Sequence, residues 1–112
     1  MKNIKLIIIR IWSRYGPRRK LIINEGDTPP KSLKSRNLYL AQEDGEDWAI
    51  ALKCPCGCGD RLELQLIPEL TPHWKLLNHE KERPSIHPSI WRQYGCKSHF
   101  WIKEGRIHWC KP

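Results

Sequence analysis

The sequence predicts an all-β fold with little helix, and two observations lead to this prediction. Runs of four to eight residues rich in Ile, Leu, Trp and Tyr recur along the chain, which is the spacing of short strands. Nine prolines and seven glycines lie largely between these runs and leave little room for the interior of a helix. A chain of 112 residues is long enough for one modest core, so we expect a single domain over residues 1–112.

Each expected strand is an apolar run that ends at a turn signal. In chain order, the runs cover residues 5–11, 21–24, 38–41, 48–53, 61–67, 74–77, 100–103 and 106–109. Leu62, Leu64 and Leu66 alternate with polar residues, which is typical of a strand with one buried face. Gly105 separates the last two runs, and its freedom to adopt a positive φ predicts a tight hairpin turn there.

The N-terminal part of the chain, residues 1–35, is expected to be a basic hairpin region that precedes a metal-binding core over residues 36–112. Lys and Arg number 20 against 12 Asp and Glu, which gives a formal net charge of +8. Between residues 10 and 20, basic side chains interleave with Trp12 and Tyr15. Such a surface favours an acidic partner, and we prefer an acidic protein to nucleic acid, which is the alternative.

The expected location is the cytoplasm, with no membrane partner. No stretch of the sequence approaches the roughly 20 apolar residues that span a bilayer. The apolar start of the chain is interrupted by Arg10, and no small-residue cleavage site follows it. In a reducing compartment, an odd number of cysteines, here five, favours metal ligands or free thiols over a disulfide framework.

The cysteines are the strongest chemical signal in the sequence. The stretch KCPCGCGDRLEL, residues 53–64, places Cys54, Cys56 and Cys58 on alternate positions with glycines beside them. Glycine lets the backbone turn tightly, so that these sulfurs point at one centre. Downstream, GCKSHFWI supplies Cys96 and His99. Zinc takes four ligands of this kind, so we predict a zinc site that joins two distant parts of the chain.

The spacing leaves open which four of these five residues bind the metal. An iron–sulfur centre is the alternative, because two loops with paired ligands are also the pattern of Rieske proteins. That pattern requires a histidine where this sequence has Cys56. We therefore prefer a mononuclear zinc in a Rieske-like or zinc-ribbon-like β scaffold, that is, a small zinc-stapled β domain.

The same residues carry a resemblance to a known family. CPCGCG, a Leu-rich strand, Trp74, HPSI and CKSHFWI, with a glycine hairpin after them, resemble a small bacterial zinc-binding family over roughly residues 36 to 110. Genes of that family lie beside those for ubiquitin-like proteins and for activating-enzyme-like and conjugating-enzyme-like proteins. The resemblance implies metal binding at Cys54, Cys56, Cys58, Cys96 and His99. It also implies a protein partner in a ubiquitin-like conjugation system: a ubiquitin-like protein, or its activating-like or conjugating-like enzymes.

A second chemical pattern is PSIHPSI, residues 84–90. Ser85, His87 and Ser89 stand on alternate positions, and a serine close to a histidine is typical of hydrolases. The preferred interpretation is a rigid, turn-rich connector, because it contains two prolines and its serines can satisfy local backbone groups.

Three functions are carried forward from the sequence. The first is a zinc-stapled accessory or partner-binding protein of a bacterial ubiquitin-like conjugation pathway. The second is a small isopeptidase-like hydrolase that acts on ubiquitin-like conjugates, with His87 or a non-ligand His99 as the base. The third is a nucleic-acid-binding zinc module. Trp91 and Trp101, which flank the Cys96 loop, are the candidate anchors for a partner.

Overall fold

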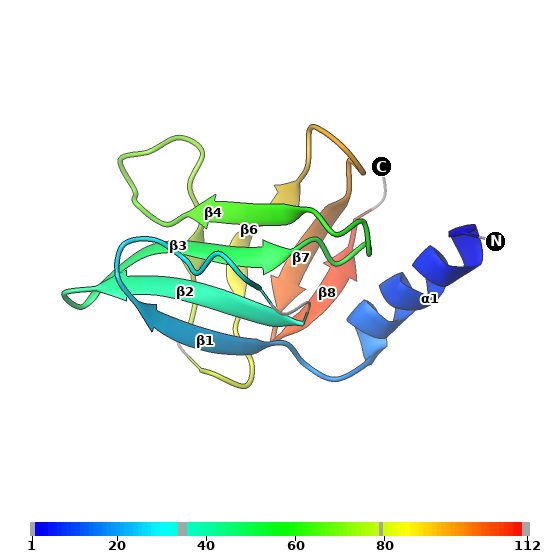
Figure 1. The fold of residues 1–112 in the computed structure, drawn as a ribbon, viewed down its shortest axis with the longest axis horizontal. Coiled ribbons are helices and arrows are strands. Elements are labelled where there is room, and N and C mark those ends of the chain that lie inside the picture. The colour runs from blue at the N-terminus through cyan, green and yellow to red at the C-terminus, as the bar shows by residue number, and fades with distance from the viewer. Residues whose placement is uncertain (1, 34–35, 79, 111–112) are drawn as a thin grey trace.

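Two four-stranded sheets and one N-terminal helix make up the fold (Figure 1). The computed structural model of the protein describes residues 2–33, 36–78 and 80–110. Its elements are α1 (Lys2–Tyr15), β1 (Lys20–Glu25), β2 (Asn37–Glu43), β3 (Glu46–Lys53), β4 (Arg61–Gln65), β5 (Lys75–Leu76), β6 (Ile86–Trp91), β7 (His99–Lys103) and β8 (Arg106–Trp109). The predicted all-β class is confirmed.

The first sheet has the order β1-β2-β3-β4 and the second has the order β5-β6-β7-β8. β1 and β2 pair in parallel, and all the other neighbours pair antiparallel. The turn between β7 and β8 has positive φ at Glu104 and at Gly105, as a type I′ turn requires, so the predicted glycine hairpin is confirmed. An equivalent turn at Asp44 and Gly45 joins β2 to β3.

The core lies between the two sheets, whose strands cross in Figure 1. Apolar side chains from both sheets form one continuous buried cluster. Its fully buried members include Leu38, Ile50, Phe100, Ile102 and Ile107. Leu64 and Leu66 are buried and Leu62 packs against the cluster, as the alternation in β4 predicted.

The prediction of a strand over residues 5–11 is wrong, because this segment belongs to the helix α1. Ile4, Ile7, Ile8 and Ile11 recur at intervals of three and four residues, which is the helical period, and that period outweighs the β preference of isoleucine. The basic hairpin expected within residues 1–35 is not formed at its N-terminal part, because α1 occupies Lys2–Tyr15. In the part of the chain that the structure describes, no helix is long and apolar enough to cross a membrane.

Residues 84–90 are also more regular than a turn-rich connector. Ile86 and Ile90 are buried, and they pair with Ile102 and Phe100 to place β6 beside β7. The register shifts between Ile86 and Ile90, on either side of Pro88. A proline has no N–H to donate to the ladder, and an irregularity at this point removes the need for one. The connector interpretation missed the strand that carries Ser89.

Candidate metal centre and serine–histidine pair

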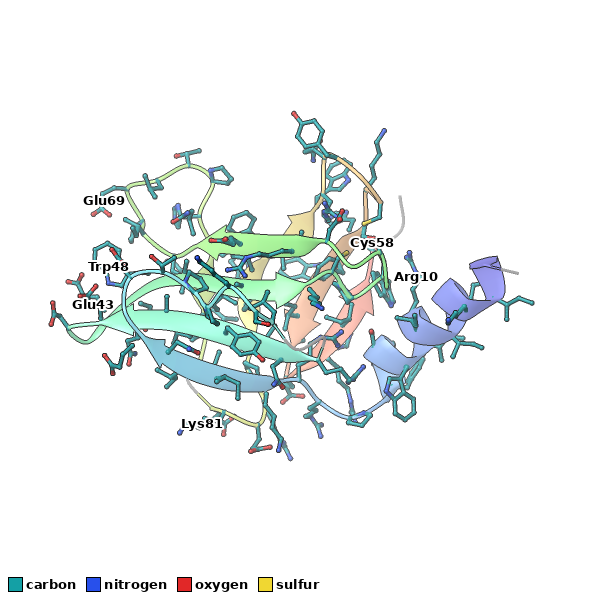
Figure 2. The ribbon with its side chains drawn as sticks, viewed as in Figure 1. Arg10, Glu43, Trp48, Cys58, Glu69 and Lys81 are labelled. Carbon is teal, nitrogen blue, oxygen red and sulfur yellow. The ribbon has the colours of Figure 1, made fainter. Side chains whose placement is uncertain are left out.

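Four cysteines converge at the loop between β3 and β4, where Figure 2 labels Cys58. Cys54, Cys56 and Cys58 belong to the loop between β3 and β4, and Cys96 belongs to the loop between β6 and β7. Their sulfurs all lie within 4.8 Å of one another. The Cys54 sulfur is 3.4 Å from that of Cys56 and 3.5 Å from that of Cys96. The cluster therefore connects the two sheets through their loops.

The loop sequences place these sulfurs. Gly57 and Gly59 have φ of 95° and 84°, a conformation that other residues rarely adopt, and they reverse the chain between the cysteines. The Cys54 N–H donates to the Asp60 carbonyl at 2.8 Å and closes the loop. In the second loop, the Arg92 N–H donates to the Ser98 carbonyl at 2.8 Å, which closes the turn that presents Cys96.

The donor set fits a zinc ion. Sulfurs bound tetrahedrally at about 2.3 Å lie roughly 3.8 Å apart, close to the separations found here. Burial raises the pKa of the Cys54 and Cys58 thiols. Burial acts the same way on Cys96, but hydrogen bonds from Ser98 outweigh it and lower the Cys96 pKa to about 6. The cluster thus includes one sulfur that is readily a thiolate, the form that binds metals.

Arg92 is a cluster residue that the sequence analysis did not single out. Its Nη1 lies 3.5 Å from the Cys58 sulfur and 3.3 Å from the Cys96 sulfur, and it forms a 3.0 Å ion pair with Asp60. A guanidinium in this position stabilises negative charge on the sulfurs. No spacing pattern in the sequence marks Arg92, because its role depends on two loops meeting.

His99 does not join the cysteines. In the described part of the chain, the group of side chains that could hold a metal ion consists of the four cysteines. The His99 Nε2 instead lies 2.9 Å from the Ser89 Oγ, so a hydrogen bond joins the two side chains. Among the five candidate ligands, geometry therefore selects Cys54, Cys56, Cys58 and Cys96.

The Ser89–His99 pair bridges β6 and β7. His99 faces Trp91 across the two strands, and their rings stack with centroids 5.0 Å apart at an interplanar angle of 10°. The Trp74 indole N–H donates to the Ser89 carbonyl at 3.3 Å. Both Ser89 and His99 are half-buried. Trp91 thus contacts His99 and Trp74 contacts Ser89, while both members of the pair keep some access to solvent.

The other candidate catalytic residues lie apart from this pair. The Ser85 Oγ accepts a hydrogen bond from the Glu104 N–H at 2.8 Å, which ties β6 to the β7–β8 turn. The His87 ring packs against the Trp101 ring, with the ring centroids 5.6 Å apart. Of the residues proposed from PSIHPSI, only Ser89 contacts a histidine side chain among the described residues.

A cavity of about 530 Å³ lies on the outer face of the second sheet. Its lining includes His87, Trp101, Lys103 and His108. His99 and Trp101 are two residues apart on β7 and therefore point to the same face, about 7 Å from each other. Trp101 lines the cavity, whereas Ser89 and His99 are not among its lining residues.

These features define a class: a small two-sheet β domain with a tetrathiolate metal-site candidate and a separate, solvent-accessible serine–histidine pair. The sequence model of the BubE family, described as bacterial ubiquitination-like system serine protease, matches residues 25–110. The chain belongs to this family, which is a family of a bacterial ubiquitination-like system. No curated protein and no solved structure was found to match the chain. Zinc binding and the neighbouring genes stay predictions.

Proposed function

We propose that this protein is a serine protease that cleaves a ubiquitin-like protein or its conjugates, with Ser89 as nucleophile and His99 as general base. The single observation that carries the proposal is the 2.9 Å contact between Ser89 Oγ and His99 Nε2. This distance is the hydrogen-bond reach expected of a nucleophile and its base. The family description names the same chemistry, and both residues lie within the matched region.

The proposed reaction has two halves. The Ser89 Oγ attacks the carbonyl carbon of the scissile bond while its proton moves to His99 Nε2. The C–N bond then breaks, the same proton passes to the leaving amine, and an acyl ester on Ser89 remains. A water molecule then attacks the ester carbon while one of its protons moves to His99; the bond from this carbon to Ser89 Oγ breaks, the proton passes from His99 to Oγ, and the product leaves as a carboxylic acid.

The base is oriented in an unusual way in this proposal. In the described part of the chain, the His99 ring forms its hydrogen bond with Ser89. We assign the orienting role to Trp91, whose indole stacks on the imidazole and fixes the plane of the ring. The outer-face cavity, whose lining includes Trp101 two residues from His99, would receive the substrate chain.

Zinc has a structural role in this proposal. The four cysteines would hold the ion, and four protein ligands leave no open position for a reacting group. A bound zinc would fix the loop that precedes His99, because Cys96 is three residues before it. The tetrathiolate site thereby supports the serine–histidine pair without taking part in the reaction.

The hydrolase is preferred here to the accessory role because a nucleophile and a base are in contact. The test uses a fluorophosphonate probe, which labels activated serines, and a ubiquitin-like protein of the same system that carries a C-terminal extension. Wild-type protein should be labelled at Ser89 and should cleave the extension. Ser89→Ala and His99→Gln should each lower the cleavage rate by about 10³-fold or more.

Ser32→Ala and His73→Gln are matched controls outside both the Ser89–His99 pair and the lining of the outer-face cavity, and both should retain activity. Circular dichroism and zinc content check that each variant keeps its fold. Equal labelling of wild type and Ser89→Ala would overturn the assignment of the nucleophile. If folded, zinc-loaded wild-type protein neither reacts with the probe nor cleaves the extension, the protease proposal is wrong and the accessory, partner-binding role is favoured.

A further inference from the structure

A second cavity, of about 430 Å³, lies between α1 and the cysteine loop, away from the proposed protease pair. Figure 2 labels Arg10 of α1 and Cys58 of that loop, which mark the two segments although neither residue lines the cavity. One wall of the cavity is apolar and includes Ile8, Trp12 and Pro55. The remaining lining includes three cations, Arg19, Arg36 and Lys53.

Arg19 is the most informative of these residues. It is 2% exposed, and its Nη2 donates to Ser13 Oγ at 3.2 Å. Its Nε and Nη1 are buried without a hydrogen-bond partner. No carboxylate of the described residues forms an ion pair with it. A buried guanidinium with two unsatisfied nitrogens costs several kcal/mol unless something compensates it.

The cationic side of the cavity is held in place by the fold. The Arg19 N–H donates to the Gly105 carbonyl at 2.7 Å, which anchors its backbone to the β7–β8 turn. The Arg36 Nη2 donates to the Pro17 carbonyl at 2.6 Å. Burial, together with the nearby charge of Arg36, lowers the Arg19 pKa to about 10, as expected for cations gathered without a counter-charge.

The metal centre does not remove this imbalance. A zinc ion with four thiolates carries two negative charges, and Cys54 is close enough to interact with Arg19. Three cations line the cavity, so one positive charge remains in excess. The Arg19 Nε and Nη1 form no hydrogen bond to a sulfur either.

We infer that this cavity binds a carboxylate through Arg36 and Lys53, with the attached aliphatic group against the apolar wall and the uncompensated charge of the buried Arg19 behind them. One excess positive charge matches a carboxylate better than a phosphate dianion. The carboxylate can come from the C-terminus of a polypeptide or from an acidic side chain. This inference does not depend on the protease proposal, because none of these three residues takes part in the reaction.

The test measures binding to the full zinc-loaded chain by isothermal titration calorimetry. The probes are an acetylated tripeptide ending in leucine with a free carboxylate, the same peptide as its amide, an amidated peptide with one glutamate, and inorganic phosphate. The free-carboxylate peptide should bind saturably, and amidation should weaken it about tenfold or more. Binding of the glutamate peptide at equal strength would identify an acidic side chain as an equivalent source.

Arg36→Met and Lys53→Met should each weaken the binding of the carboxylate peptide about tenfold. The matched control variants Lys20→Met and Lys75→Met replace exposed lysines and should leave this binding unchanged. These variants keep the test decisive even where Arg19→Met fails to fold. Ser89→Ala should bind normally, which separates this site from the protease. The inference is overturned by equal binding of acid and amide, by tighter binding of phosphate, or by no effect of Arg36→Met.

Discussion

The indole of Trp91 stacks on the imidazole of His99 across two antiparallel strands, with ring centroids 5.0 Å apart and planes within 10° of parallel. Trp91 is 62% exposed, so its open face remains available while its other face holds the histidine. The stack and the Ser89 hydrogen bond act on the same ring. The stack with Trp91 constrains the plane of the imidazole, and the hydrogen bond to Ser89 constrains the position of its Nε2 atom.

Trp91 should therefore act as a positioning residue, if the protease proposal holds. Trp91→Ala should lower kcat for cleavage about tenfold through misplacement of the base, with a smaller change in KM. Trp91→Phe should restore most of the rate, because it keeps a stacking ring. Tyr94→Ala, at a site that is 82% exposed in the neighbouring loop, is the control. A rise in KM with an unchanged kcat would instead make Trp91 a substrate contact.

Metal removal should unfold much of the molecule. We expect about one zinc per chain by elemental analysis, and loss of the cooperative thermal transition after chelation. Structural zinc contributes about 10–16 kcal/mol in small finger peptides, which equals the stability of many whole domains. Cys54→Ser should reproduce this loss. Cys110→Ser, which removes a thiol outside the cluster, should keep both zinc and stability, and an unchanged melting curve for Cys54→Ser would contradict the prediction.

Alanine substitutions at two glycines with the same φ can distinguish the cost of backbone strain from the cost of a steric clash. Gly45 and Gly105 both have φ of +77°. A Cβ on Gly45 would meet nothing within 4 Å, whereas one on Gly105 would lie 2.9 Å from Arg18 Cβ and from the Arg19 carbonyl oxygen. Gly45→Ala should cost about 1–2 kcal/mol of unfolding free energy. Gly105→Ala should cost roughly 2 kcal/mol more by denaturant titration, and equal losses would refute the close contact.

His108 should make the fold less stable in mild acid. Burial lowers the pKa of His108, and the positive charges of Arg14, Lys103 and Arg106 lower it further, although Glu104 opposes them. The unfolded chain therefore binds a proton more readily than the folded one, and stability falls as the pH drops below about 6.5. Unfolding free energies at pH 7.5 and 5.5 should differ less for His108→Asn than for the wild type. An identical pH dependence would show that His108 does not contribute.

The amino-acid sequence by itself determined the β class, six of the strands beyond the N-terminal region and the loop of three cysteines. These are local properties. Alternation places Leu64 and Leu66 on one face of β4, and glycine permits the positive φ values at Gly57 and Gly105. The first apolar run was misjudged because isoleucine favours strands, while its spacing in Ile4, Ile7, Ile8 and Ile11 is helical.

Only the tertiary structure decided which residues work together. His99 was a candidate metal ligand by spacing, but pairing of β6 with β7 brings it to Ser89 and leaves Cys96 to the cluster. Sequence spacing measures separation along the chain, whereas a ligand set or a nucleophile–base pair depends on contacts between side chains from distant segments. The unpaired charge of Arg19 emerged in the same way, because burial against α1 and the cysteine loop is a property of the folded chain alone.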